Sequence, residues 1–534
     1  MAPKTMKPAL TINSNFQAIY RRRRMHFAWR LFALVSLLAL LGCHFPQPSM
    51  QEQGDFAQRQ TDIAGILNPE NPGTPTPQTL PTEGITGVTP PSSPIERSEG
   101  YLIYTIQQGD TLQALSKRFG VEPAEIQADL PLSPTGLLPI GMRTQIPDTL
   151  ESVLPYVDPI LPDSEVIYGP SVGDFDAAEY ARAANGFLAG YTELVKGEVM
   201  TGPEILQRVA LETSTNPRLL LAFLEYRSGW VFGHPPNAEK NRYPIGFGAS
   251  DSGLYNELMI TAKLLAQGFY GWRDGSILTL NFYKGGQGRL SPGLNAGSAA
   301  LMALFAALHD QTAWKGQLFG EASFLDFYLT QFGDYWSRAA QVEPYLRSTD
   351  RQPDLSLPFA PGEAWSLTGG PHITWQTGTP RGALDFAPIT GEPPCSVSTR
   401  WVTASASGLV VRSDRGVVAL DLDGDGDEGT GWVLIYMHIA EQDRVAHGVW
   451  IDADAYIGHP SCEGGQSTGT HVHLARKFNG EWQGVEEPFP MILSGWLAFV
   501  GAARYEGYLQ KGDRMVTSRP DGASGSTIIR DDSP

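Results

Sequence analysis

Four histidines and one aspartate in the last third of this chain constrain its fold more than any other feature. The tightest spacing is in His471-Val472-His473, where a single residue separates two histidines. Residues two apart on a β-strand point to the same face. An extended segment here would therefore place both rings in one cleft while Val472 packs behind them. The remaining members of the set are His372, Asp385 and His438.

These side chains have the chemistry of a catalytic metal site. Neutral imidazoles and a carboxylate are what Zn²⁺ takes as ligands. Three protein ligands leave a fourth position for water, which is the arrangement of a catalytic zinc rather than a structural one. Two of the five side chains then remain to move protons. A lone histidine is more often an ordinary hydrogen-bonded residue, so the prediction depends on the whole set.

Three local strings between roughly Leu357 and Gln510 carry a family resemblance. They are Ala383 to Pro388, Tyr436 to His438 and Ser467 to His473. They resemble the zinc endopeptidases of the lysostaphin and beta-lytic type, peptidase family M23, which cut the peptides of peptidoglycan. The resemblance implies a C-terminal antiparallel β-sheet peptidase domain that binds one zinc ion.

The resemblance also implies a role for each residue of the set. Many family members place the first zinc histidine four residues before the aspartate, where this chain has Arg381. The beta-lytic subgroup places it further upstream, after a Gly-Gly step, and His372 follows Gly369-Gly370-Pro371. The implied zinc ligands are His372, Asp385 and His473. The implied catalytic residues are His438 and His471, which would handle the proton and the oxyanion.

The N-terminal end has the pattern of an export signal. Arg21 to Arg24 precede an apolar stretch from Leu31 to Leu41, which is too short to span a bilayer comfortably. Leu40-Leu41-Gly42-Cys43 resembles a bacterial lipobox, which implies cleavage before Cys43 and a lipid on its thiol; the alternative is an uncut signal anchor. Either way, the body of the protein lies outside the cytoplasm and is tethered to the membrane.

Charge and cysteine content agree with an exported wall protein. The net charge of −18, with no basic face apparent in the folded part, argues against nucleic acid as a partner. If Cys43 carries lipid, Cys395 and Cys462 remain, and in an oxidising compartment we expect a disulfide between them. The alternative is two free buried thiols.

A second resemblance lies between Tyr101 and Pro147. Helical spacing from Leu112 to Phe119, a break at Gly120 and a short second helix at Glu125 to Leu130 predict a βααβ unit. The unit resembles a LysM module, which implies binding of N-acetylglucosamine-containing glycans. The marks of the family that imply glycan binding are Gly109, Asp110, Thr111 and Leu112; the alternative is a structural unit without a ligand.

The middle of the chain is predicted to be mostly helical, and one of its helices spans Ala178 to Val195. The segment from Pro217 to Gly229 faintly resembles the first active-site helix of lysozyme-like enzymes. In those enzymes a glutamate directly precedes Ser-Gly, but here Arg227 stands there and Glu225 lies two residues earlier. Two residues turn a helix by about 200°. An accessory or degenerate lysozyme-like domain is therefore expected.

One acidic loop, Asp421 to Gly429, has oxygen ligands at alternate positions, as Ca²⁺ prefers. Flanking helices and the usual glutamate of an EF-hand are missing, so an acidic hairpin loop is favoured over a calcium site.

The sequence thus predicts a multidomain protein: a membrane-tethered zinc endopeptidase that acts on peptidoglycan and is targeted by a LysM module. Two rivals remain, a non-enzymatic activator of other wall hydrolases and a glycan-cleaving enzyme that uses the helical domain. The predicted segments are a signal peptide with lipobox at 1–43, a disordered Pro/Thr-rich linker at 44–99, the LysM domain at 100–149, a connector at 150–170, the helical domain at 171–350, the peptidase domain at 355–511 and a disordered tail at 512–534.

Overall fold

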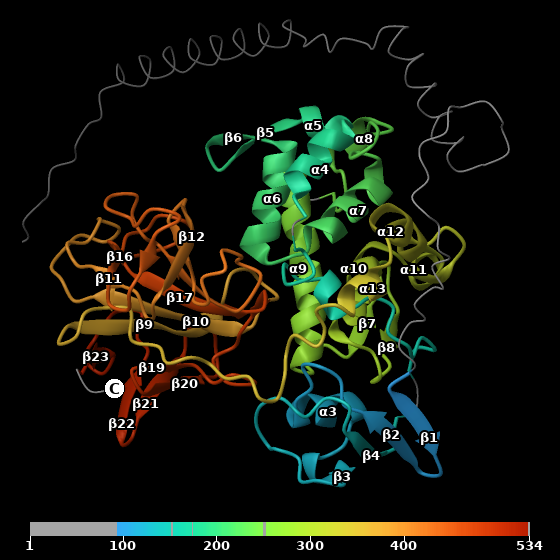
Figure 1. The fold of residues 1–534 in the computed structure, drawn as a ribbon, viewed down its shortest axis with the longest axis horizontal. Coiled ribbons are helices and arrows are strands. Elements are labelled where there is room, and N and C mark those ends of the chain that lie inside the picture. The colour runs from blue at the N-terminus through green and yellow to red at the C-terminus, as the bar shows by residue number, and fades with distance from the viewer. Residues whose placement is uncertain (1–92, 151–152, 174, 249–251, 532–534) are drawn as a thin grey trace, which may run out of the picture. The chain divides into compact units, whose positions relative to one another are not determined.

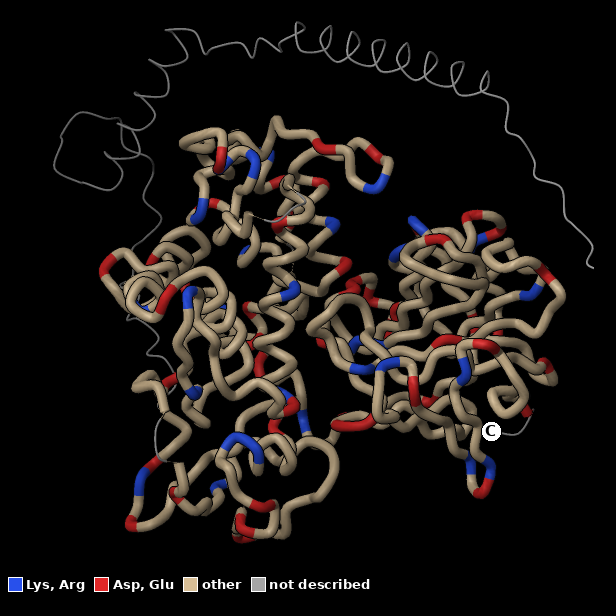
Figure 2. The backbone as a smooth tube through the Cα atoms, turned by 180° about the vertical axis from the view of Figure 1, so that it is seen from behind, with Lys and Arg blue, Asp and Glu red and all other residues tan. Residues whose placement is uncertain are grey.

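The computed structural model describes residues 93–531, apart from 151–152, 174 and 249–251. All described residues belong to one compact unit, Ile85–Pro534 (Figure 1). The predicted signal peptide, Cys43 and most of the predicted linker lie outside the described residues. Within the described part, no helix combines the length and apolar character needed to cross a membrane. Figure 2 shows basic and acidic positions mixed along the chain.

The first region is a small sheet with one helix packed on it. Tyr104, Leu115 and Phe119 are fully buried in its core, and Gly120 ends the helix in the left-handed conformation, with φ of 69°. The sheet order is β1-β2-β4-β3. The elements are β1 (Ile95–Ser98), β2 (Tyr101–Thr105), α3 (Leu112–Phe119), the 3-10 turn η1 (Pro123–Glu125), β3 (Gln127–Ala128) and β4 (Arg143–Pro147).

Two expectations for this region need correction. The second helix, predicted at Glu125 to Leu130, is replaced by the short turn η1 and the two-residue strand β3, which pairs with β4. The end of the predicted linker is also ordered, because β1 forms a ladder along β2. The backbone makes these hydrogen bonds whatever the side chains, so apolar spacing did not indicate them.

The middle region is helical, with two short hairpins. Helix α7 shows why the sequence folds this way: Asn216 caps its start, Pro217 occupies its first turn, and Gly229 ends it with φ of 66°. The elements are η2 (Asp163–Glu165), α4 (Ala177–Ala184), α5 (Phe187–Gly190), β5 (Thr192–Val195), β6 (Glu198–Thr201), α6 (Gly202–Thr213), α7 (Pro217–Ser228), α8 (Ala238–Arg242), α9 (Leu254–Arg273), β7 (Thr279–Asn281), β8 (Gln287–Arg289), α10 (Ala296–Leu308), α11 (Gln311–Phe319), α12 (Phe324–Phe332) and α13 (Tyr335–Ala339).

The boundaries of this region differ from those expected. The helix predicted from Ala178 to Val195 ends at Asn185, which adopts the left-handed conformation, and the segment finishes as strand β5. Part of the predicted connector at 150–170 belongs to the helical core. Asp163 and Glu165 are buried there, and Glu165 accepts hydrogen bonds from the side chains of Tyr328 and Arg338. Partnered buried charges give no apolar signal in the sequence.

The last region is built on an antiparallel sheet of nine strands, in the order β15-β12-β13-β14-β17-β10-β9-β23, with β18 paired to β17. A second sheet follows the order β19-β20-β21-β22, and β11 pairs with β16. The bounds are β9 (Ala364–Ile373), β10 (Arg381–Pro388), β11 (Val402–Thr403), β12 (Gly408–Asp414), β13 (Val417–Asp421), β14 (Trp432–Met437), β15 (Trp450–Ile451), β16 (Tyr456–Gly458), β17 (Val472–Phe478), β18 (Glu481–Trp482), β19 (Ile492–Leu493), β20 (Trp496–Val500), β21 (Gly507–Lys511), β22 (Arg514–Thr517) and β23 (Thr527–Ile529).

The two faces of the large sheet belong to different cores. On β17, Val472 and Leu474 join a core made only of residues 355–528, whereas Ala475 on the opposite face joins the core of the helical region. The same alternation separates Leu384 from Ala383 on β10. The helical region therefore covers one face of the large sheet. The residues that the sheet region gives to the helical core are Ala383, Val417, Ala419, Trp432, Val433, Ile435, Ala475, Trp482 and Phe489.

Polar contacts fix the same junction, chiefly through the β17–β18 hairpin. The Ser214 hydroxyl donates to the carbonyl of Gly480 at 2.6 Å, and the backbone N–H of Trp482 donates to the Tyr270 hydroxyl at 2.9 Å. The Arg273 guanidinium pairs with Glu481 at 2.6 Å. These groups are largely buried, so the helical and sheet regions meet as parts of one structure.

The tail predicted to be disordered from residue 512 is ordered in the structure. Strand β22 pairs with β21, and β23 pairs with the edge of the large sheet at β9. Val516 and Ile528 are the buried side chains of these strands. One buried apolar residue in each short strand is too little to make an alternating pattern, and the strands form because an existing edge accepts them.

Candidate metal centre

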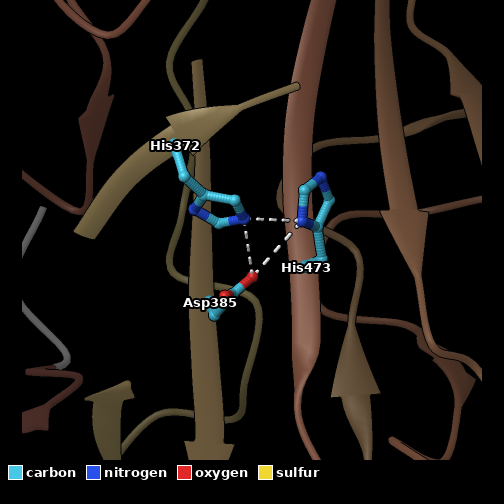
Figure 3. Close-up of side chains that lie close together, drawn as sticks. All are labelled: His372, Asp385 and His473. Atoms are coloured by element: carbon cyan, nitrogen blue, oxygen red, sulfur yellow. Dashed lines mark hydrogen bonds and ion pairs between the residues drawn. The ribbon is translucent and has the colours of Figure 1, made fainter. Parts of the chain in front are cut away.

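Three of the predicted residues come together on neighbouring strands. His372 lies near the end of β9, Asp385 lies in β10, and His473 lies in β17 (Figure 3). In the ladder register, Asp385 stands directly opposite His473, and His372 stands opposite Ala383. Asp385 and His473 project from the sheet face that Ala383 and Ala475 share with the helical core, which follows from the alternation along each strand.

The three side chains present a compact set of ligand atoms. His372 Nε2 lies 3.0 Å from His473 Nδ1, and Asp385 Oδ1 lies 3.3 Å from each of these nitrogens. All three residues are buried. Asp385 Oδ1 is buried without a hydrogen-bond partner, which is costly unless something else satisfies it. A carboxylate oxygen and two ring nitrogens around one point form the donor set of a Zn²⁺ site.

Backbone carbonyls set which ring nitrogens face this point. His372 Nδ1 lies 2.9 Å from the Gly370 carbonyl, and His473 Nε2 lies 2.9 Å from the Thr374 carbonyl. A carbonyl can only accept, so these two nitrogens carry the protons. In the neutral rings His372 Nε2 and His473 Nδ1 are therefore the unprotonated nitrogens. This is the tautomer that a metal ligand needs. Burial would lower the pKa of His372, but the hydrogen bond and charge of Asp385 outweigh burial and raise that pKa, so without a cation a proton on Nε2 is shared with Asp385.

The electrostatics keep Asp385 ionised. Burial would raise the pKa of Asp385, but its contacts with His372 and His473 hold that pKa well below its usual value. Burial lowers the pKa of His473, which favours the neutral ring. An ionised carboxylate beside a neutral imidazole is the state in which both groups coordinate a cation.

The other two predicted histidines lie beside the first three. The ring centroids of His438 and His471 are 4.5 Å apart, and His471 Nε2 is 3.6 Å from Asp385 Oδ1. His438 Nδ1 donates to the carbonyl of Glu463 at 2.7 Å, and His471 Nδ1 donates to that of Gly469 at 2.8 Å. Both rings therefore have an unprotonated Nε2 when neutral. Burial, followed by the charges of His471 and His473, lowers the pKa of His438 to about 4.

Two further residues complete the site, and one of them was not predicted. The Tyr505 ring stacks on His372, with centroids 4.4 Å apart and planes at 23°. Arg381 occupies the position where many relatives have a ligand, and it donates instead to the carbonyls of Pro371 and Ala503. It thereby ties the segment that carries His372 to the loop that carries Tyr505. A single tyrosine in an irregular loop gives no sequence signal.

A disulfide closes one side of the site. Cys395 and Cys462 are bonded across 67 residues of sequence, with their Cα atoms 5.1 Å apart. The Thr470 hydroxyl donates to the carbonyl of Ser396, so the segment after Cys395 also contacts the strand that leads into His471. The bridge therefore connects two loops next to His438 and His471.

The residues expected to contact glycan are buried in the structure. Asp110 accepts hydrogen bonds from the Tyr104 hydroxyl and from Arg118, each at 2.7 Å. Thr111 caps helix α3, and the Arg273 guanidinium lies directly over Gly109. The residues involved are Gly109, Asp110, Thr111 and Leu112. They build the module and its contact with the helical region, because a short polar turn before a helix serves capping as readily as binding.

A cavity of about 320 Å³ opens beside these residues. Ile106, Gln107 and Ile140 line it from the first region, and Trp336 and Glu343 line it from the helical region. This is a surface at which the module remains open to a ligand.

Two other candidate groups accept hydrogen bonds from nearby backbone N–H groups. Glu225 accepts hydrogen bonds from the N–H groups of Val231 and Phe232, at 2.7 and 3.0 Å, and burial raises its pKa. In the acidic loop, the carboxylates of Asp421, Asp423 and Asp425 come within 4.8 Å of one another. Asp421 is nevertheless occupied by three backbone N–H groups of that loop.

Comparison with known proteins identifies two of the regions. Residues 104–147 match the LysM domain, and residues 159–344 match the model named "LasA, N-terminal domain". The helical region is therefore similar to part of LasA, where the sequence had suggested a lysozyme-like domain.

Relatives that match longer parts of the chain extend this similarity into the sheet region. Protease LasA of Pseudomonas aeruginosa is 26% identical over 322 residues, which are 56% of this chain and 72% of that protein. Beta-lytic metalloendopeptidase of Lysobacter enzymogenes is 28% identical over 160 residues, or 28% of this chain and 83% of that one. The M23 metalloprotease pseudoalterin covers 32% of this chain and 96% of its own, with 24% identity and a TM-score of 0.26. The chain accordingly carries a LysM domain and a region that matches the LasA N-terminal domain, and it is similar to Protease LasA and to beta-lytic metalloendopeptidases.

Proposed function

We propose that this protein is a zinc endopeptidase that hydrolyses peptide bonds in peptidoglycan and is directed to the wall by its LysM module. One observation carries the proposal. Asp385 Oδ1 is buried without a hydrogen-bond partner between two imidazole nitrogens whose protons are held elsewhere. Two more imidazoles lie beside this group. A site built for structure alone would satisfy that oxygen with an N–H or O–H donor.

His372, Asp385 and His473 would hold the zinc ion through the three atoms that face one another. When bound there, zinc supplies Lewis acidity, which polarises a carbonyl and lowers the pKa of water. The carbonyls of Gly370 and Thr374 keep the two rings in the binding tautomer, and Tyr505 holds the plane of His372.

His471 is suited to take a proton from water. Its Nδ1–H is held by the Gly469 carbonyl, so Nε2 is free to accept, and this nitrogen lies 3.6 Å from Asp385 Oδ1. His438 is held in the same way by Glu463. It donates to a developing oxyanion only after Nε2 has gained a proton. The two histidines thus form a pair in which one accepts while the other, once protonated, donates.

Export and tethering complete the proposal. A lipid on Cys43 would anchor the chain at the envelope, with residues 44–92 as a spacer ahead of the described domains. We assign the LysM module to 95–149, the LasA-type region to about 159–350 and the peptidase to 355–531.

The tether has a direct test. Export in a bacterial host with labelled palmitate should mark the protein, and Cys43→Ser should remove the label because the thiol is the attachment site. Cys395→Ser is the matched control, since it changes a cysteine outside the signal. Absence of label from both the wild-type chain and the Cys43→Ser variant would leave a simple signal anchor as the explanation.

The function is tested by digesting several peptidoglycan types and analysing the fragments by mass spectrometry. New peptide termini should appear with the wild-type protein. His438→Ala and His471→Ala should keep zinc and fold but lose roughly 10²- to 10⁴-fold in rate, as expected for acid–base and oxyanion groups. Their double variant should lose less than the product of the two, since such groups act together.

His447→Ala is the control, because it removes an exposed histidine outside the site. Cleavage of glycan bonds instead of peptide bonds would favour the helical domain as the active part. A protein that binds zinc but yields no fragments with any wall type would favour the activator role.

A further inference from the structure

Two basic side chains of the helical region converge on one exposed glycine. Arg227 lies in the last turn of α7, and Lys240 lies in α8. A Cβ atom on Gly246 would stand 3.2 Å from Lys240 Nζ and 3.4 Å from Arg227 Nη2. Both cations also donate to the same carbonyl oxygen, that of Ile245, at 2.9 Å for Arg227 Nε and 3.4 Å for Lys240 Nζ. We call this place the Gly246 notch.

The two charges lack a direct counter-charge. Among the described residues, neither Arg227 nor Lys240 forms an ion pair within 4.0 Å. The nearby carboxylate, Glu257, is completely buried and accepts hydrogen bonds from the backbone N–H groups of Ile245 and Gly246. Half-buried charges are normally paired. Holding two cations side by side without a direct partner therefore destabilises the folded protein, and no contact in the described structure offsets this.

The electrostatics show the same cost. Burial lowers the pKa of Arg227, and for Lys240 burial is followed by the repulsion of Arg227 as a cause of its lowered pKa. His309 joins the pair, with Nε2 3.1 Å from Arg227 Nη1. Burial and the Arg227 charge lower the pKa of His309 to about 4, so its ring is neutral at neutral pH. Since Arg227 can only donate, Nε2 is the acceptor and Nδ1 carries the proton.

The atoms that remain open in the notch are all donors. Arg227 Nη2 has no hydrogen-bond partner in the described structure, and Lys240 Nζ uses only one of its three N–H groups. Gly246 is exposed and has no side chain to fill the space between the two groups. An oxyanion is the ligand that accepts from several N–H donors at once and also neutralises the charge.

We propose that Arg227 and Lys240 bind an oxyanion of the wall polymer. His309 contacts Arg227, and Gly246 leaves the space between the two cations open. The chemistry fits a carboxylate or a phosphate. The identity of the polymer rests on the proposed function, but the anion site itself does not. A second anchoring point of this kind, in addition to the LysM module, would raise the local concentration of substrate at the peptidase.

The test measures binding by the full chain rather than cleavage, so a failure of the catalytic proposal leaves it intact. The probes are inorganic phosphate, a disaccharide peptide with free carboxylates, and the same fragment with its carboxylates amidated. Arg227→Gln and Lys240→Gln should each weaken binding of the recognised probe by roughly tenfold or more, as expected for hydrogen bonds to a charged group. Arg242→Gln, an equal change of charge on the exposed side of α8, should leave binding unchanged.

The probes separate the two sources. Loss of binding on amidation assigns the site to a carboxylate, and binding of phosphate alone assigns it to a phosphate polymer. Equal affinity in Lys240→Gln and the wild type overturns the proposal, as does an equal loss in Arg242→Gln. If Arg227→Gln fails to fold, Lys240→Gln carries the test, because it removes only one hydrogen bond of 3.4 Å. Its unfolding temperature should match or exceed that of the wild type without ligand and should rise less on adding the recognised probe.

Discussion

His473→Ala is expected to remove zinc and peptide cleavage together. His473 supplies Nδ1 to the buried group of three atoms, and its strand neighbours Val472 and Leu474 cannot replace it, because they belong to the opposite core. Loss of one of three ligands should reduce affinity well beyond the roughly 10–100-fold typical of residues that only orient a ligand. Metal analysis should find roughly one zinc per wild-type chain and close to none in the variant.

His372→Ala and Asp385→Ala should behave in the same way. His459→Ala is the matched control, since it removes a buried histidine that donates to the Arg400 carbonyl and lies outside the ligand set. Full zinc occupancy in both His372→Ala and Asp385→Ala would falsify the assignment.

The peptidase region is expected not to separate from the helical region once the chain between them is cut. The side chains that the sheet gives to the helical core, such as Ile435 and Trp482, are buried. Each large apolar side chain exposed by separation would cost about 1.5–3 kcal/mol. A specific protease site placed in the partly exposed segment 347–354 should be cut, and the two pieces should still elute together from a sizing column.

Denaturant should be needed to part them, and a chain beginning at residue 355 should aggregate when produced alone. The uncut chain with the same inserted site is the control for the insertion itself. A second control is Trp482→Ala, which should loosen the cut complex by removing the largest shared side chain of the β17–β18 hairpin. Recovery of residues 355–534 as a folded monomer would contradict the shared core.

The sequence predicted that His372, Asp385 and His473 would lie together, because each of them sits in a local string and because side chains alternate along a strand. His471-Val472-His473 required two rings on one side, and the structure places Val472 in the opposite core. The partner groups could not be predicted. Thr374, Gly370 and Glu463 act through backbone carbonyls, which every residue possesses, so their side chains carry no information about the site.

The failures have a common physical cause. The strands after residue 512 form on an edge supplied by β9 and β21, and the buried Asp163 and Glu165 are held by distant partners. Asp110 looked like part of a binding loop and is instead paired with Arg118 inside the module. In each case a specific pairing between residues decides the outcome, and local composition does not show it.

The division of the large sheet between two cores also bears on how such a chain can evolve. The LysM module keeps its own core and meets the helical region largely through polar contacts, such as that of Arg118 with the Trp272 carbonyl. A recombination event could exchange it with little loss. The peptidase and the helical region share one core, which contains side chains such as Ala383 and Ile435. Replacing either region would therefore expose the apolar surface of the other to water. Those two regions are expected to be inherited as a single genetic unit.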